Sequence, residues 1–250
     1  MANLFLGFPV PRAKIADMIS GSAPPSLHKT QHQDGGTDEI DVTGLVGAGG
    51  LTLPFTDFIY SAAFESLDGY RFTDVAGGAI TLNGEQIQLE TAGASGDEYS
   101  IRKVINHQPV PMTWDKKKAF ITAARLSAGG SSNGYQFVGM GTYVSGNCLG
   151  FAVINGLFQA IAKTGAGTEA YTIANWSAGA YDQQKRLKII HNPGVSVQFY
   201  VDEVLVYTAT TQIPAEATNA SIILHAIVKN TAAGNWLSMF LSHYQYYQAA

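Results

Sequence analysis

Cysteine is nearly absent from this chain, since Cys148 is the single one among 250 residues. One thiol cannot form a disulfide within the chain, which excludes the disulfide framework typical of small secreted domains. Cys148 is followed by an apolar run and has no basic neighbour in the sequence. We therefore expect a buried thiol that packs as a small apolar side chain and does not react.

Charge is scarce as well. Asp, Glu, Lys and Arg make up 14% of the residues, and the formal net charge is −4. A nucleic-acid binder needs a basic surface along the phosphates, and we interpret the one basic cluster, Lys116, Lys117 and Lys118, as a solvated turn. The sequence therefore predicts no nucleic-acid partner. It also lacks the run of about 20 apolar residues that a transmembrane helix needs and the basic start of a signal peptide, so we expect no membrane span.

Short alternating segments between turn residues are what the chain does contain. Pro193 presets φ for a turn, and Gly194 accepts the positive φ that follows. Beyond this turn, Val197, Phe199 and Val201 alternate with polar residues, which is the pattern of a strand with one buried face. Asp202 and Glu203 then predict a second reversal of the chain.

Similar segments recur throughout the sequence after residue 64. The predicted strands span residues 78–82, 86–91, 99–105, 119–126, 135–143, 149–154, 157–163, 187–191, 195–201, 204–210, 221–229 and 236–245. Asn83-Gly84 and Asn155-Gly156 are the strongest hairpin-turn signals. Many short strands without a long helical pattern predict an all-β sandwich.

The region 64–248 resembles the concanavalin A-like (laminin G-like) jelly roll. The resemblance rests on the Asn155-Gly156 hairpin, the strand 187–190, the segment 198–202, the Ile213-Pro214 turn and the final aromatic strand. It implies a concanavalin A-like jelly-roll β-sandwich over residues 64–250. Members of this fold class include lectins, which bind carbohydrates, and glucanases.

Residues 1–63 differ from the rest, and we expect an extended N-terminal attachment and oligomerisation segment. Its polar stretch 28–45 resembles the His- and Gly-rich linker of bacteriophage tail-fibre and other virion structural proteins. The residues that carry this resemblance are His28, His32, Gly35, Gly36, Asp38 and Ile40. It implies attachment to other virion proteins of the capsid or tail, self-association as a homotrimer, and a location in the virion after synthesis in the host cytoplasm.

Catalysis is not predicted, and neither is a cofactor or a metal. Glycoside hydrolysis needs two carboxyl groups across the sugar bond, but the adjacent Asp202 and Glu203 fit a turn better. His28 and His32 alone cannot complete a zinc site of about four ligands. Calcium near Asp97 or Asp182 lacks a ligand pattern.

A binding surface is the remaining expectation. The loops 128–134 and 165–181 are long and rich in small residues, as binding loops at a sandwich end are. Aromatic faces suit sugar C–H groups, so the candidates for a glycan or partner surface are Tyr143, Tyr171, Trp176 and Tyr181. If the last strand, with Tyr244, runs along a sheet edge, its aromatics would form an oligomer seam.

The sequence thus favours a non-enzymatic virion structural protein, a tail appendage, fibre or capsid decoration, whose outward jelly roll aids attachment to a host surface glycan. The alternative is a lectin-like receptor-recognition module, and a glycoside hydrolase is less favoured.

Overall fold

The computed structural model describes residues 58–104, 112–126, 134–173, 184–217, 222–233 and 236–249. The chain divides into two units, Met1–Thr52 and Leu53–Ala250, and every described residue belongs to the second. The proposed linker residues 28–40 therefore lie outside the described part, and the division into residues 1–63 and 64–250 stays a prediction.

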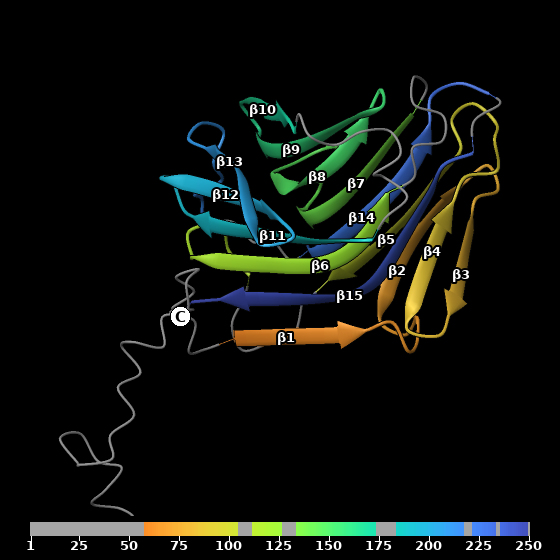
Figure 1. The fold of residues 1–250 in the computed structure, drawn as a ribbon, viewed down its shortest axis with the longest axis horizontal. Helices are drawn as coiled ribbons and strands as arrows, with labels where there is room; N and C mark the ends of the chain where they lie inside the picture. Colours follow the sequence, from red (N-terminus) through yellow and green to blue (C-terminus); the bar gives the residue numbers. More distant parts are fainter. Residues whose placement is uncertain are drawn as a thin grey trace, which may run out of the picture. The chain divides into compact units, whose positions relative to one another are not determined.

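The described residues form two antiparallel sheets and no helix (Figure 1). Sheet A has the order β13-β12-β11-β6-β15-β4-β3, with β1 also paired to β15. Its strands are β1 (Phe58–Ala63), β3 (Ala79–Asn83), β4 (Gln86–Glu90), β6 (Lys118–Leu126), β11 (Lys185–Asn192), β12 (Ser196–Val201), β13 (Val204–Ala209) and β15 (Ser238–Gln248).

Sheet B has the order β10-β9-β8-β7-β14-β5-β2. Its strands are β2 (Tyr70–Val75), β5 (Glu98–Val104), β7 (Gly134–Gly141), β8 (Cys148–Ile154), β9 (Leu157–Thr164), β10 (Gly167–Thr172) and β14 (Ile222–Asn230). The all-β sandwich predicted from the sequence is thereby confirmed.

Alternation along the strands builds the core between the sheets. Phe199 of β12 points inward and is fully buried, as its pattern predicts, whereas Gln198 and Tyr200 face outward and remain partly exposed. Phe151 and Phe158 contribute from sheet B and stack at 5.6 Å between ring centroids. Burial of such side chains is the main stabilising term of a sandwich.

The last strand corrects one expectation. β15 is not an edge strand, because it pairs with β6 on one side and with β4 and β1 on the other. Tyr244 and Tyr246 point into the core and are 0% and 1% exposed. These two aromatics therefore stabilise the monomer and offer no oligomer seam.

The basic cluster corrects a second expectation. Lys118 does not lie in a solvated turn: it begins β6 and is fully buried. Its Nζ donates to the carbonyl oxygens of Thr113 and Lys116, and burial lowers its pKa to about 7.

Three of the predicted turns are confirmed. Asn155 and Gly156 both have positive φ, 50° and 74°, as a type I′ hairpin requires. Gly194 has φ of 63°. Asp202 and Glu203 reverse the chain with φ of 49° and 66°, although neither is a glycine.

Three strands were not predicted. β2 and β10 lie at the two edges of sheet B. β1 consists of the last six residues of the predicted attachment segment, 58–63. The segment 165–181, expected to be a loop, contains β10 as Gly167–Thr172. β2 and β10 contain no fully buried residue, so neither has the alternation of buried and exposed positions that identifies a strand in a sequence.

Candidate functional site

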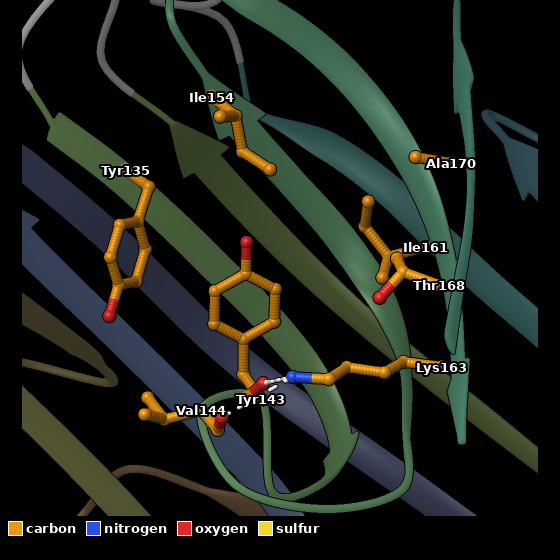
Figure 2. A pocket seen from close by; sticks show the side chains of 8 residues that line it. All are labelled: Tyr135, Tyr143, Val144, Ile154, Ile161, Lys163, Thr168 and Ala170. Carbon is orange, nitrogen blue, oxygen red and sulfur yellow. Dashed lines mark hydrogen bonds between the residues drawn. The ribbon is translucent and has the colours of Figure 1, made fainter. Parts of the chain in front are cut away.

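A pocket of about 260 Å³ lies on the outer face of sheet B (Figure 2). Its lining combines two tyrosines, one lysine and mostly apolar side chains. The lining residues are Tyr135, Tyr143, Val144, Ile154, Ile161, Lys163, Thr168 and Ala170.

The strand register explains why these side chains meet. Tyr135 is opposite Ile154, and Lys163 is opposite Thr168. Directly opposed residues of an antiparallel pair point to the same side of the sheet. The alternate residues, such as Phe151, point into the core. One face of β7, β8, β9 and β10 thus supplies all of the lining except Tyr143 and Val144.

The loop between β7 and β8 brings Tyr143 over this face. Gly141 makes this possible, because its φ is +80° and a Cβ there would lie 2.1 Å from the Asn147 carbonyl oxygen. Thr142 N–H donates to the same Asn147 oxygen at 3.0 Å, which closes the loop. The chain therefore folds back toward the sheet directly after β7.

Aromatic packing then fixes the Tyr143 ring. It stacks on Phe137 with 4.5 Å between centroids and an interplanar angle of 21°, and it lies 5.1 Å from the Tyr135 ring. Phe137 in turn covers Gly150, where an added Cβ would lie 2.3 Å from the Phe137 ring. Such aromatic pairs are worth about 0.5–1.5 kcal/mol beyond the area they bury.

Two side chains hold the Tyr143 backbone. Its N–H donates to Nδ1 of His225 at 3.3 Å, and its carbonyl oxygen accepts from Nζ of Lys163 at 2.7 Å. Lys163 also donates to the Val144 oxygen at 3.3 Å. Burial, and next the charge of Arg102, lowers the pKa of His225 to about 3. The imidazole is therefore neutral at physiological pH, and its Nδ1 can accept.

The phenols provide hydrogen-bonding groups in the pocket. Burial raises the pKa of Tyr143 to about 12, and burial together with Glu98 raises the pKa of Tyr135 well above its ordinary value. Both hydroxyls therefore stay protonated. Within the described ranges, neither hydroxyl hydrogen-bonds to another residue. Each is available to a ligand as donor and acceptor.

Cys148 lies beneath this surface and is fully buried. Burial raises the pKa of its thiol to about 12, although Lys163 lowers it in part. The expectation that Cys148 is buried and packs as a small apolar side chain is confirmed. Among the described residues, no three His, Cys, Asp or Glu side chains form a group that could hold a metal ion.

Of the two predicted surface residues that the structure describes, Tyr143 lines the pocket and Tyr171 does not. Tyr171 points to the opposite face of β10 and stacks on Tyr207 at 4.2 Å. Trp176 and Tyr181, like Asp182, lie outside the described ranges. Asp97 is described, and its Oδ2 accepts from the Ala94 N–H at 2.7 Å.

Sequence reasoning missed most of the pocket, including Tyr135 and Lys163. Ile161 and Lys163 are two positions apart in a predicted strand, so the sequence does indicate that their side chains lie on the same face. The sequence does not indicate a pocket on this face, because the pocket forms only where the loop carrying Tyr143 lies over the sheet.

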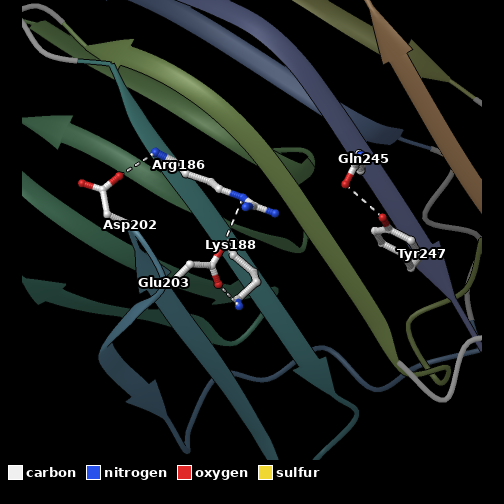
Figure 3. A network of polar contacts seen from close by, with 6 residues as sticks. All are labelled: Arg186, Lys188, Asp202, Glu203, Gln245 and Tyr247. Atoms are coloured by element: carbon white, nitrogen blue, oxygen red, sulfur yellow. Dashed lines mark hydrogen bonds and ion pairs between the residues drawn. The ribbon is translucent and has the colours of Figure 1, made fainter. Parts of the chain in front are cut away.

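A polar cluster on the outer face of sheet A is the second feature of the surface (Figure 3). Glu203 accepts from Lys188 at 2.5 Å and pairs with Arg186 at 3.2 Å, while Asp202 pairs with Lys185 at 2.7 Å. The predicted turn role of both acids is confirmed. Each of the two acids is paired with at least one cation of β11, and these ion pairs stabilise the β12–β13 turn.

No known protein family's sequence pattern matches the chain, and no curated protein matches it. Solved structures do match. One is of botulinum neurotoxin type C, whose cell entry depends on interaction with two ganglioside molecules; it is 14% identical with a TM-score of 0.50, and the match covers 71% of this chain and 43% of that one. Another is the binding domain of botulinum neurotoxin DC in complex with rat synaptotagmin II, 12% identical with a TM-score of 0.51, covering 71% and 42%.

The chain therefore spans less than half the length of these structures. At such low identity the likeness shows a shared β-sandwich fold. In the part of the chain that the structure describes, no helix is long and apolar enough to cross a membrane.

Proposed function

We propose that the β-sandwich is a non-enzymatic, lectin-like recognition domain that binds a sugar in the pocket between Tyr135, Tyr143 and Lys163. One observation carries the proposal: two tyrosine rings, held by packing, lie beside apolar side chains, and among the described residues neither hydroxyl has a hydrogen-bond partner. Aromatic faces contact sugar C–H groups, and hydroxyls hydrogen-bond to sugar hydroxyls.

The size and rigidity of the pocket support this assignment. A volume of about 260 Å³ is just below the range of about 300–1,000 Å³ typical of small-molecule sites, so it suits a single sugar residue. Tyr143 is fixed before a ligand arrives, which lowers the entropic cost of binding. The fold is shared with a neurotoxin whose cell entry depends on gangliosides, which supports the proposal by analogy only.

A glycan array probed with the full chain tests the proposal. We expect Tyr143→Ala to weaken binding to any glycan hit by about tenfold or more, as loss of a central aromatic contact does. Tyr171→Ala is the matched control, because it removes an exposed tyrosine from the other face of β10. Equal loss in both variants, or none in Tyr143→Ala, would refute the assignment to this pocket.

The finer proposal is that this domain is displayed on a bacteriophage particle. Residues 1–63 would attach it to capsid or tail proteins, and the sandwich would contact a host surface glycan. Its support is the linker resemblance around His28 and His32. A virion location and a homotrimer follow from that resemblance.

Light scattering of the full chain tests self-association. A mass of three chains supports trimerisation, and a mass of one chain refutes it. Labelling purified particles with an antibody to the sandwich tests the virion location, and absence of label would overturn it.

A further inference from the structure

Lys163 places a positive charge at one end of the pocket, 5.8 Å from the Tyr143 ring centroid, and among the described residues no carboxylate neutralises it. Lys163 Nζ uses two of its three N–H groups on the carbonyl oxygens of Tyr143 and Val144. Both acceptors are neutral. Across the described residues no carboxylate pairs with Lys163, whereas on the same face Lys229 pairs with Glu98 at 2.9 Å.

The other end of the pocket is apolar. In Figure 2 the Lys163 ammonium lies by the loop carrying Tyr143 and Val144, and Ile154 lies at the opposite end, with Ile161 and Ala170 along the side. A ligand that fits both ends combines a negative group with an apolar substituent.

We propose that the sugar bound here is acidic: a monosaccharide unit whose carboxylate or sulfate pairs with Lys163 and whose apolar group, such as an acetamido methyl, contacts Ile154 and Ile161. This inference rests on the proposed sugar-binding function and names the ligand class of that site. A charge-assisted hydrogen bond at a partly desolvated lysine is stronger than a neutral one and adds selectivity against uncharged sugars.

The test compares ligands that differ only in charge, using calorimetry with the full chain. The probes are the methyl glycoside of N-acetylneuraminic acid, its neutral methyl ester, N-acetylglucosamine, and N-acetylglucosamine 6-sulfate. We expect the acid to bind about fivefold more tightly than its ester. The sulfated sugar against its neutral parent shows which anion the site prefers.

Two variants separate charge from loop anchoring. Lys163→Gln removes the charge that the acid would meet, so we expect the ratio of acid to ester affinity to fall to about one, whatever happens to the affinity for the ester itself. Lys163→Arg keeps the charge and should retain the preference. A thermal melt of each variant confirms that it folds.

The outcomes are distinct. Equal binding of acid and ester by the unchanged protein, together with weaker binding of N-acetylglucosamine in Tyr143→Ala, overturns the acidic-sugar inference and leaves the proposed function standing. Absence of binding to any probe or glycan overturns both. A charge preference that survives in Lys163→Gln also overturns the inference, because it places the anion elsewhere.

Discussion

Two buried histidines, His191 and His225, are expected to make the stability of this protein depend on pH. His225 accepts from the Tyr143 N–H, and His191 Nε2 lies 2.7 Å from the Pro214 carbonyl oxygen. His191 is fully buried and His225 is 2% exposed. Burial, then Lys118, lowers the pKa of His191 to about 4; the pKa of His225 is about 3.

Acid is therefore expected to destabilise the sandwich. Unfolded histidine has a pKa of about 6.5, so below that pH the unfolded state binds protons that the native state does not, and stability falls. The fall begins near pH 6.5 and runs to about pH 4 for His191 and to about pH 3 for His225, with a slope of ~1.4 kcal/mol per pH unit for each histidine.

Urea unfolding at several pH values measures this slope. His225→Gln should make the slope shallower, because His191 is then the one of these two buried histidines that still contributes. An unchanged slope in His225→Gln would contradict the account.

For the two tyrosines of the candidate surface, the sequence predicts the residue type but not the direction of the side chain. Both Tyr143 and Tyr171 carry the right chemistry. Only the register of β10 against β9 turns Tyr171 to the other face, and only Gly141 and Phe137 place Tyr143 over the sheet. A side chain's type is local information, while its direction depends on strands that pair at a distance.

Tight hairpins are the elements that the sequence predicted best. Asn-Gly and Pro-Gly are local signals whose backbone preference is intrinsic to the residues. The Asp202-Glu203 turn is different, because glutamate does not favour positive φ and aspartate adopts it less readily than glycine. Here an ion pair stabilises the turn. The Lys188 side chain is 5% exposed, pairs with Glu203, and its Nζ lies 4.5 Å from the Tyr200 ring centroid.

Removing one member of the Lys188–Glu203 pair should show how far the fold depends on this ion pair. Glu203→Ala leaves the Lys188 ammonium buried without its carboxylate, and we expect a loss of ~1–2 kcal/mol of unfolding free energy. Lys188→Met with Glu203→Ala removes both charges and should cost less than Glu203→Ala alone. Chemical denaturation of the single and double variants checks this, and a double variant less stable than Glu203→Ala would contradict it.

All three strands that the sequence missed, β1, β2 and β10, have a neighbour on one side only, and β1 matters for any shortened version of the protein. Its six residues pair with His243 to Gln248 of β15. A chain starting at Phe64 lacks this strand and leaves that side of β15 unpaired.

We therefore expect a chain starting at Phe64 to melt at least about 4 °C below one starting at Leu53, equivalent to ~1–2 kcal/mol. Scanning calorimetry of both versions makes the comparison. Equal melting temperatures would show that β1 contributes nothing to the sandwich.

For the whole molecule, alternation and turn spacing were enough to predict an all-β sandwich, because burial on one face per strand permits few other architectures. Which outer face would carry a pocket was not predictable. It follows from a six-residue loop between β7 and β8, residues 142–147, and from the lysine that holds it. The concanavalin A-like form of the sandwich stays a prediction.

The central claim is that this sandwich recognises a sugar on the outer face of sheet B. The most direct measurement is a crystal structure of the full chain with the strongest hit from the glycan array. The account predicts a sugar ring against Tyr135 and Tyr143, with its acidic group at Lys163. A sugar seated instead on the Tyr171–Tyr207 pair, or on the sheet A face around Tyr200, would contradict it.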